Sequence, residues 1–537
     1  MTIEYDYIII GAGSAGCVLA NRLSADSSKN VLLIEAGPED KSALIHVPIG
    51  IALLSRSQQL NWQFDTEPES ELHNRRLFWP RGKASGGSSS INAMVYIRGH
   101  KADYDGWAAL GNKGWSYEDV LPYFIKSESN QVIKNNPLHG NDGPLTVEKH
   151  RTVNPLSDIF VEAAKDAGHK KNDDFNGEHQ EGVGRYQVTQ RNGERCSSAK
   201  AYLTPVLSRP NLKVISAAHA TRVVFDGKKA IGVEYSKDGS LISANINNSG
   251  EVILSGGALQ SPQLLMLSGI GEKEVLQRHN IPLVHELAGV GKNLQDHLDI
   301  TIMHKAATKD PIAVTPLGIA RGALATVDYI KNRKGFLTSN VAESGGFVKS
   351  DDGQERPNIQ FHFLPTYLKD HGRQVMFGYG YTLHICDVTP KSRGAISLQT
   401  ANPLDDPKIE AGYLTEDEDW TNLINGYKLG REILNAKSFS NYSRKELVPG
   451  IQVETDEQIK EDIRQRAESI YHPVGTCKMG SDVLAVVDDK LRVHGVQGLR
   501  VVDASIMPNI VAGNTNAPTI MIAEKASDMI LGKSYYY

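Results

Sequence analysis

A glycine-rich turn near the N-terminus constrains the fold of this chain more than any other feature. The apolar run at residues 5–10 leads directly into Gly11-Ala-Gly13-Ser-Ala-Gly16, and a second apolar run ends in Glu35. The first glycine permits a tight turn, the second lets backbone N–H groups approach a pyrophosphate, and the third lets a helix starting near Ser14 pack on the strand. An acidic residue after the second strand suits a ribose hydroxyl. The pattern predicts a dinucleotide site in an α/β fold, and at this point NAD and FAD fit it equally.

Composition excludes some classes of protein. The 537 residues suggest about two to four domains, with room to bury a large cofactor. A formal charge of −5 without a long basic run argues against a nucleic-acid partner. No C-x-x-C pair occurs, so we expect inert core thiols in a reducing compartment. The four cysteines are Cys17, Cys196, Cys386 and Cys477.

The N-terminal residues do not resemble a targeting signal. Glu4 and Asp6 interrupt the start, where a secretory signal needs an apolar core. No segment approaches the roughly 20 apolar residues of a membrane span. We therefore expect a cytoplasmic protein, with peripheral contact at the inner face of the cytoplasmic membrane left open.

A second run of small residues follows Trp79, from Gly82 to Asn92. A flexible linker is one interpretation of such a composition. Because Trp79 precedes the run and an apolar stretch at 91–97 follows it, a packed loop with backbone donors aimed at a ligand fits better.

Local patterns divide the rest of the chain. We expect a strand at 251–254, a helix starting at Ser261-Pro262, and further helices over 154–167, 417–434 and 456–468. Alternating patterns at 358–363 and 381–385 predict an antiparallel sheet. A strand at 499–503 and an amphipathic helix over 518–530, with Pro518 near its first position, complete the chain.

These elements predict an α/β fold with a discontinuous Rossmann-like domain and an inserted α+β substrate domain built on an antiparallel sheet. The first domain comprises residues 1–154, 211–300 and 465–537. The second comprises residues 155–210 and 301–464.

Motifs of several other chemistries are missing from the sequence. There is no second G-x-G-x-x-G, no H-E-x-x-H, no P-loop and no G-x-S-x-G. We therefore expect one dinucleotide site, no metal site, and oxidoreduction as the remaining chemistry.

Two C-terminal residues are candidates for that chemistry, His472 and Asn514. Pro473 restricts the backbone of His472 to extended conformations, and imidazole has a pKa suited to taking a proton near neutrality. Asn514 precedes the last helix, so its amide can donate to an alcohol or alkoxide oxygen near a positive helix end. The alternative is that His472, one of 17 histidines, is only a packed or surface residue.

Four motifs together resemble the glucose–methanol–choline (GMC) family of FAD-dependent oxidoreductases. They are the fingerprint at 11–16, the loop at 82–92, the segment from Gly257 to Gly271, and the paired segments around His472 and Asn514. The resemblance covers nearly the whole chain and implies FAD, with His472 as the catalytic base and Asn514 as its partner where other members have a second histidine.

The resemblance also implies where FAD lies. Glu35 would hold the adenosine ribose, Val223 would lie near the adenine, the loop from Arg81 to Asn92 would line the pyrophosphate and isoalloxazine, and Asp503 with Ala504 would face the phosphate and ribityl chain. The full implied set is Gly11, Gly13, Ser14, Gly16, Glu35, Ala36, Trp62, Arg81, Gly82, Gly86, Gly87, Ser90, Asn92, Ala93, Val95, Val223, Asp503, Ala504, Asn514, Thr515 and Asn516.

Two positions depart from the family pattern. Ser85 stands where a larger aliphatic residue is usual, which affects loop packing rather than chemistry. Ile91 stands where some members have a histidine bonded covalently to the flavin. We therefore expect non-covalent FAD.

The implied reaction oxidises a primary alcohol to an aldehyde. His472 would take the hydroxyl proton, Asn514 would steady the oxygen, and a hydride would pass to flavin N5. Segments between His362 and Gly394 are most similar to bacterial aliphatic alcohol dehydrogenases that use an acceptor other than oxygen, such as a quinone, so we favour medium-chain aliphatic or aromatic alcohols.

Alternatives remain open from the sequence. Choline dehydrogenases share much of the remaining sequence, and choline would need aromatic faces around its ammonium group. A flavin photoenzyme that decarboxylates fatty acids and a non-catalytic flavin-binding protein are more remote alternatives. Light dependence would separate the photoenzyme from an alcohol dehydrogenase.

Overall fold

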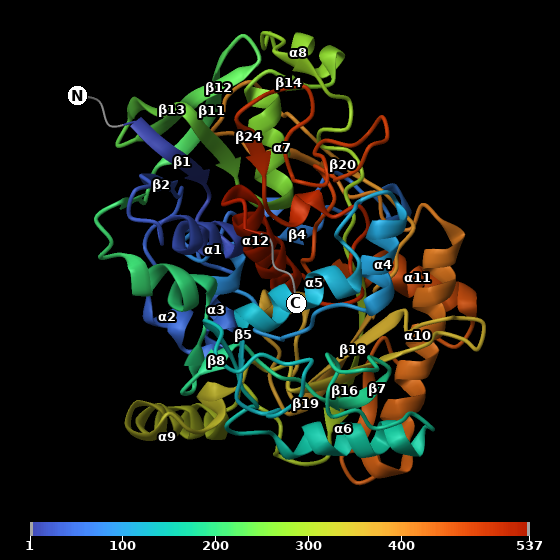
Figure 1. Cartoon of the computed structure of the whole chain (residues 1–537). Coiled ribbons are helices and arrows are strands. Elements are labelled where there is room, and N and C mark those ends of the chain that lie inside the picture. The colour runs from blue at the N-terminus through green and yellow to red at the C-terminus, as the bar shows by residue number, and fades with distance from the viewer. Residues whose placement is uncertain (1–3, 534–537) are drawn as a thin grey trace.

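Two β-sheets assembled from interleaved parts of the chain organise the structure (Figure 1). It is a computed structural model that describes residues 4–533. The sheet containing β1 lies at the top of Figure 1 and the sheet containing β16 at the bottom.

The first sheet has seven strands within the described residues. β10, β2, β1, β13 and β24 lie side by side in parallel, and β12 and β11 extend the sheet in antiparallel pairing from the first half of β13. The parallel strands come from three distant parts of the chain, which confirms the predicted Rossmann-like fold class. Its strands are β1 (Glu4–Ile10), β2 (Val31–Ile34), β10 (Leu212–Ile215), β11 (His219–Asp226), β12 (Lys229–Lys237), β13 (Ser240–Leu254) and β24 (Leu499–Val501).

Helix α1 (Ser14–Leu23) packs on β1 and β2, and α12 (Asn516–Ile530) packs alongside α1 in the same direction. At their starts Ser14 Oγ donates to Asn516 Oδ1 at 2.7 Å, and eight residues further along each helix Arg22 pairs with Glu524 at 2.6 Å. The expected amphipathic character of α12 is wrong, because every residue from Ala517 to Asp528 is buried. The helix is instead a central element with neighbours on all sides.

Helix α7 (Gly257–Leu267) begins four residues before the expected start at Ser261. The Asp503 carboxylate accepts hydrogen bonds from Gly257 N–H at 2.9 Å and Ser261 Oγ at 2.6 Å, which stabilises the first turn. Pro262 has no N–H to donate to the Ala258 carbonyl, and the Thr476 hydroxyl donates to that oxygen at 2.6 Å instead. Both partners lie more than 200 residues away in sequence, so no local pattern reveals the true start.

The second sheet is antiparallel throughout and also has seven strands in the described part of the chain. Helices α6 (Pro155–Asp166) and α10 (Asp417–Asn435) pack on one face, where Phe160 stacks on Phe363. Alternate residues His362 and Leu364 face a cavity on the other side. The strands are β7 (Gly182–Arg185), β16 (Leu298–Ala306), β17 (Ser344–Val348), β18 (Ile359–Leu364), β19 (Gly380–Asp387), β22 (Ser443–Val448) and β23 (Glu468–Ser469).

These strands confirm the antiparallel sheet expected from the patterns at 358–363 and 381–385. The division of the chain at residues 154, 210, 300 and 464 stays a prediction. The sequence analysis did not anticipate helix α9 (Pro316–Asn332), although its start has a recognisable pattern: Pro316 is its first residue, and the Thr315 side chain accepts from Gly318 N–H.

The remaining elements surround the two sheets. The other helices are α2 (Ala43–His46), α3 (Ile51–Leu54), α4 (Lys101–Ala109), α5 (Tyr117–Ser127), α8 (Lys273–Arg278) and α11 (Asp456–Arg466). Two-stranded sheets in residues 4–533 pair β3 (Phe64–Asp65) with β4 (Phe78–Trp79), β5 (Glu128–Asn130) with β6 (Leu145–Val147), β8 (Gln190–Arg191) with β9 (Glu194–Arg195), β14 (Ile270–Gly271) with β15 (His285–Glu286), and β20 (Ala395–Ser397) with β21 (Lys408–Glu410).

Candidate active site

A cavity of about 660 Å³ lies where the carboxyl ends of β1 and β2 meet the second sheet. This volume falls within the ~300–1,000 Å³ of typical ligand pockets. Residues from the fingerprint, the loop at 80–95, the start of α7, strand β18 and the C-terminal segments all line it. The geometry therefore joins the N-terminal motif and the C-terminal candidates in one space.

The fingerprint glycines serve different purposes. A Cβ on Gly16 would lie 1.8 Å from the Gly11 carbonyl oxygen, so Gly16 is required for packing α1 on β1. A Cβ on Gly13 would meet only the Ser255 carbonyl at 3.9 Å, and one on Gly257 would meet nothing within 4 Å. Both of the latter line the cavity. Gly257 has φ +84°, which itself favours glycine, whereas neither the backbone conformation nor a neighbouring atom requires glycine at position 13. A bare Gly13 therefore fits a cradle for a bound cofactor.

Glu35 lines the cavity beside this cradle. Its carboxylate accepts from Ala12 N–H at 2.7 Å and from Gly37 N–H at 2.8 Å. Burial raises the pKa of Glu35 to about 7, against the lowering effect of these two hydrogen bonds. Each carboxylate oxygen keeps capacity for a second bond, so the side chain can still accept from ribose hydroxyls.

The loop at 82–92 is packed rather than flexible. Gly86 has φ +93° and donates its N–H to the Ala12 carbonyl at 2.7 Å, and a Cβ on Gly87 would lie 2.7 Å from Gly13 Cα. The buried Arg195 guanidinium donates to the carbonyls of Ser89 and Asn92. The linker interpretation is therefore wrong, because the loop forms one wall of the cradle.

Three helices begin at the cavity: α1 at Ser14, α7 at Gly257 and α12 at Asn516. The first N–H groups of a helix have no partner within the helix, and its start carries the positive end of the helix dipole. This arrangement suits the phosphates of a dinucleotide.

Most residues of the implied FAD set line the cavity. They are Gly11, Gly13, Ser14, Glu35, Ala36, Trp62, Arg81, Gly82, Gly87, Asn92, Ala93, Val95, Asp503, Ala504, Asn514, Thr515 and Asn516. Gly16, Gly86, Ser90 and Val223 lie behind the lining. Val223 is buried and its N–H donates to Ser268 Oγ, while Ala218, His219 and Ala220 line the cavity nearby. The contact of each residue with FAD stays a prediction.

His472 is held by its backbone. Its N–H donates to Asp296 Oδ1 at 2.6 Å, and the other oxygen of that buried carboxylate accepts from the hydroxyls of Ser469 and Tyr413. Arg81 donates to the carbonyl of Tyr471 at 2.5 Å. The loop that holds the imidazole is therefore anchored from both sides.

The imidazole of His472 has a partner at each nitrogen. Asn514 Nδ2 faces Nε2 at 3.2 Å, and His297 Nδ1 lies 3.0 Å from Nδ1. Gln360 Nε2 donates to Asn514 Oδ1 at 3.2 Å, which turns the NH₂ of that amide toward His472. Burial first, and then the neighbouring His297, His362 and Arg81, lower the pKa of His472 well below its usual value. The ring is neutral at neutral pH and can accept a proton.

The sequence analysis missed Asp296, His297, Gln360 and Arg195. Asp296 and His297 end a polar run just before the apolar strand β16, and Gln360 alternates with His362 on a strand whose other face is apolar. Polar residues in such a pattern indicate a face turned to a site, so this signal was available in the sequence.

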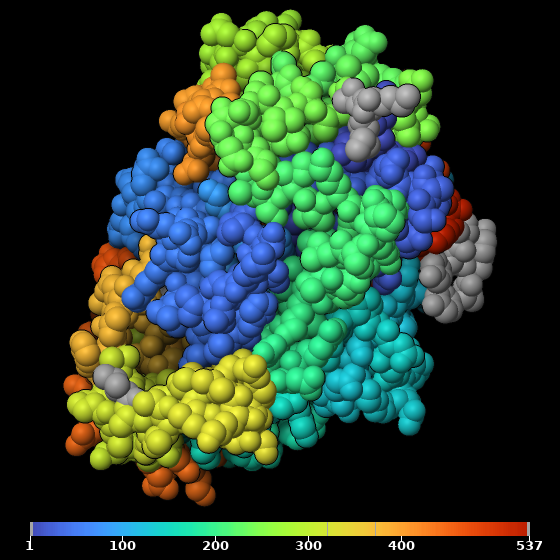
Figure 2. Space-filling model, turned by 90° about the vertical axis from the view of Figure 1, so that its left-hand side faces the viewer, coloured from blue at the N-terminus to red at the C-terminus, as the bar shows by residue number. Residues whose placement is uncertain are grey.

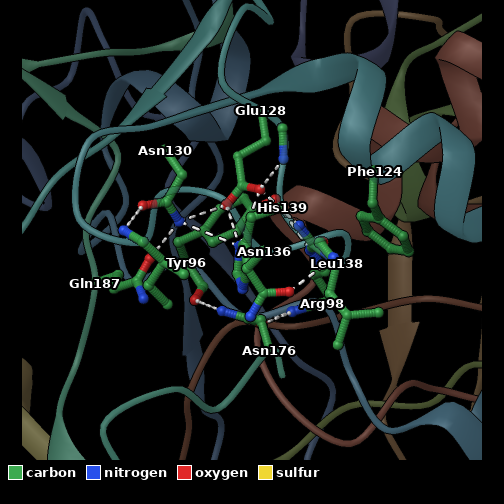
Figure 3. A network of polar contacts seen from close by, with 12 residues as sticks. Tyr96, Arg98, Phe124, Glu128, Asn130, Asn136, Leu138, His139, Asn176 and Gln187 are labelled. Atoms are coloured by element: carbon green, nitrogen blue, oxygen red, sulfur yellow. Dashed lines mark hydrogen bonds and ion pairs between the residues drawn. The ribbon is translucent and has the colours of Figure 1, made fainter. Parts of the chain in front are cut away.

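A buried network supports the cavity wall from behind (Figure 3). The Arg98 guanidinium pairs with Glu128 at 2.7 Å, and His139 links Glu128 to Asp174. Asn176 accepts from Arg98 N–H and donates to the Tyr96 carbonyl. These bonds fix the segment that follows the cavity-lining Val95.

The half of the cavity beyond His472 is mainly apolar. Its lining residues include Ile312, Val314, Val341, Leu364, Tyr367 and Met376. Among the described residues that line the whole cavity, the only carboxylates are Glu35 and Asp503, and both accept hydrogen bonds on the cofactor side. Metal ligands are also missing, because no group of three or more His, Cys, Asp or Glu in the described residues could hold an ion.

Comparison with known proteins agrees with this geometry. The family described as GMC oxidoreductase matches residues 5–299 with its N-terminal model and 390–523 with its C-terminal model. The chain is 59% identical to an alcohol dehydrogenase [acceptor] of Pseudomonas putida, over 98% of this chain and 96% of that protein. It is 45% identical to the mitochondrial choline dehydrogenase of Mus musculus, over 98% of this chain and 90% of that protein. The structure of pyridoxine 4-oxidase from Mesorbium loti superimposes with a TM-score of 0.88 at 29% identity, covering 99% of this chain and 100% of that one.

The cradle predicts that Gly13→Ala weakens FAD binding without unfolding the protein. The added methyl group meets no protein atom closer than 3.9 Å but occupies cofactor space, so we expect the dissociation constant of FAD to rise at least about tenfold. Apoprotein titration with FAD measures it. Gly106→Ala, in α4 with no atom within 4 Å of the new Cβ, is the matched control. Equal FAD affinity in both variants would contradict the proposed cradle.

A separate measurement tests whether FAD is bound non-covalently. Acid precipitation of the FAD-loaded protein should leave the yellow colour in the supernatant, because a dissociable flavin is released when the protein unfolds.

Proposed function

Since this chain belongs to the GMC oxidoreductase family, we propose that it oxidises apolar primary alcohols to aldehydes and passes the electrons to an acceptor other than oxygen, such as a quinone. It is an FAD-dependent oxidoreductase that acts on CH–OH donors. The observation that supports the finer proposal is the neutral His472 with Asn514 at the junction of the cofactor cradle and the apolar half of the cavity.

In the proposed reaction, His472 and Asn514 both bind the hydroxyl group of the substrate. A substrate hydroxyl that reaches His472 Nε2 in place of the Asn514 amide would give its proton to the imidazole and accept a hydrogen bond from Asn514 Nδ2. That bond strengthens as negative charge develops on the oxygen. A positioned base of this kind contributes about 10²–10⁴ to the rate. FAD, when bound, supplies the hydride acceptor.

The apolar half of the cavity supports a neutral substrate over choline. A quaternary ammonium is recognised by aromatic faces, and burying its charge needs a compensating group. Tyr367 and Tyr471 line this half, but the two lining carboxylates are on the cofactor side. The choline dehydrogenase alternative rests on sequence similarity, and the lining favours a medium-chain aliphatic or aromatic alcohol. The photoenzyme alternative does not need a base, whereas the anchored, neutral His472 supports a reaction that uses one.

The first test is flavin reduction in the dark. Under nitrogen, a primary alcohol should bleach the flavin of the purified protein without light. FAD-loaded His472→Ala should do so about 10²–10⁴ times more slowly, because it lacks the base. Stopped-flow absorbance measures the rate. Near wild-type reduction in this variant would mean that another group takes the proton.

The second test separates alcohols by size and charge. Each additional buried CH₂ contributes about 0.8 kcal/mol, so kcat/KM should rise about fourfold per methylene from butanol toward octanol. Choline should be slower than butanol. Steady-state rates with a dye acceptor measure this series. A kcat/KM for choline above that for octanol would favour the choline dehydrogenase alternative.

A surface beside the cavity supports peripheral membrane contact. On α9 the side chains of Leu317, Leu324, Val327 and Ile330 are exposed. Leu324 is 73% exposed and Ile330 is 68% exposed. Val314, which lines the cavity, pairs with Phe377, which is 78% exposed. The yellow segment containing α9 lies beside the blue segment containing α2 and α3 (Figure 2). We call these six residues the apolar rim.

Basic residues flank the apolar rim. Residues 309–334 carry five Lys or Arg and two Asp, in a chain whose net charge is −5. An apolar face with flanking cations is typical of helices that lie on an anionic lipid surface, where each cation contributes about 1 kcal/mol. No helix in residues 4–533 is long and apolar enough to span a membrane. The rim fits surface contact, which would bring the cavity close to lipophilic alcohols and quinones.

The third test uses vesicles of phosphatidylglycerol and phosphatidylethanolamine. The wild-type protein should sediment with them, and more weakly with phosphatidylcholine alone. Leu324→Glu with Ile330→Glu should reduce binding at least about tenfold, because two apolar side chains no longer enter the lipid. Leu241→Glu is the control, because Leu241 is also exposed but lies in β13, at the opposite end of the molecule from α9 (Figure 1). Binding of the double variant equal to that of the control contradicts the assignment.

A further inference from the structure

His297 lies directly behind the ring of His472. The two Nδ1 atoms are 3.0 Å apart, and the ring planes meet at 89° with centroids 5.2 Å apart. Backbone bonds hold the two residues in register, since Ile470 N–H donates to the His297 carbonyl and Gln295 pairs with Val474. His297 is fully buried and is not part of the cavity lining.

We propose that His297 is a positioning residue that fixes the tautomer of His472, accepting its Nδ1–H and thereby leaving Nε2 unprotonated toward the substrate. The proposal rests on the proposed function of His472 as the base. It assigns His297 a role in catalysis without contact to the reacting atoms.

The hydrogen-bond pattern requires this tautomer. A neutral imidazole carries one proton, on either Nδ1 or Nε2. Asn514 Nδ2 donates to Nε2, so that nitrogen must be the acceptor and Nδ1 must carry the proton. In the described residues His297 Nδ1 is the atom that receives it. The tautomer of a catalytic histidine is commonly set by the bond at its other nitrogen.

His297 itself is available as an acceptor. Burial lowers the pKa of His297 to about 3, although the Val388 carbonyl acts in the opposite direction. The ring is therefore neutral, and its proton lies on Nε2 when Nδ1 accepts. A protonated His297 would present an N–H and repel the N–H of His472.

The neutral acceptor behind the ring affects how strong a base His472 is. In hydrolase triads a carboxylate behind the imidazole stabilises the imidazolium. Here the adjacent carboxylate of Asp296 binds the backbone N–H of His472 and two hydroxyls, while the ring faces neutral His297. Two charged groups lie near the ring: the Asp296 carboxylate, which binds the backbone of His472, and the Arg81 guanidinium. Arg81 and His362 both lower the pKa of His472. His472 stays a weak base that releases its proton readily after each turnover.

Two substitutions of His297 distinguish the effect of losing the hydrogen-bond acceptor from the effect of changing the side-chain volume. His297→Asn keeps an acceptor, because Asn Oδ1 occupies the position of His Nδ1. His297→Leu has similar bulk and no acceptor, so His472 Nδ1–H is left unpaired and the Nε2–H tautomer becomes favoured. We expect anaerobic flavin reduction to slow by about 100-fold or more in the Leu variant and by less than about tenfold in the Asn variant, with KM for the alcohol little changed.

A spectroscopic measurement tests the tautomer independently of activity. Proton NMR of ¹⁵N-histidine-labelled, FAD-loaded protein should show a far-downfield Nδ1–H resonance of His472 in the wild type and in His297→Asn. The resonance should be absent in His297→Leu. It should also be absent in His472→Gln, and that absence assigns the resonance to His472. A wild-type His472 protonated at Nε2, or equal reduction rates in FAD-loaded Leu and Asn variants, would overturn the proposal. If no alcohol reduces the wild-type flavin, the proposed function fails while the NMR result still decides the tautomer.

Discussion

The parallel packing of α1 on α12 is the contact on which the site depends. It places the start of the N-terminal helix and the start of the C-terminal helix side by side, through the bond between Ser14 and Asn516. Further along, the fully buried Glu524 pairs with Arg22 and Lys126 and accepts from Tyr202. Removing one partner of a buried pair costs about 3–5 kcal/mol, so this alignment is strongly maintained. The cofactor cradle and the pair of His472 and Asn514 share one cavity because these two helix starts lie side by side.

Buried carboxylates hold the irregular segments around that cavity. Glu35 binds the N–H groups of Ala12 and Gly37, Asp503 binds that of Gly257, and Asp296 binds that of His472. Loops near a ligand cannot satisfy their backbone in a helix or sheet, and an unpaired buried N–H costs free energy. A carboxylate accepts two or more such bonds from a fixed position. The site is thus rigid although most of its residues lie outside regular elements.

Local patterns explain what the sequence could predict. The glycines at 11, 13 and 16 and the alternation at 358–363 are properties of neighbouring residues, so the first turn and the second sheet were predictable. His297 and His472 are 175 residues apart and meet only because Gln295 pairs with Val474. The start of α7 likewise depends on Asp503 and Thr476. Such contacts follow from the fold and leave no periodic signal, whereas α9 had a local signal in Thr315 and Pro316.

The cavity divides electrostatically into two halves, and this division follows from the same architecture. Three helix starts and Arg81 bring positive groups suited to phosphates to the cradle, which also contains the carboxylates of Glu35 and Asp503. Beyond His472 the described lining is mainly apolar, and its polar members include His362, the Asn514 amide and Arg56, whose guanidinium donates to the Gly372 carbonyl. Burial lowers the pKa of His297 and of His362, so both of these imidazoles are uncharged. In the proposed reaction, the negative charge that develops on the substrate oxygen would be met by the Asn514 amide and the protonated His472, so one pair of residues would both remove the proton and stabilise the charge.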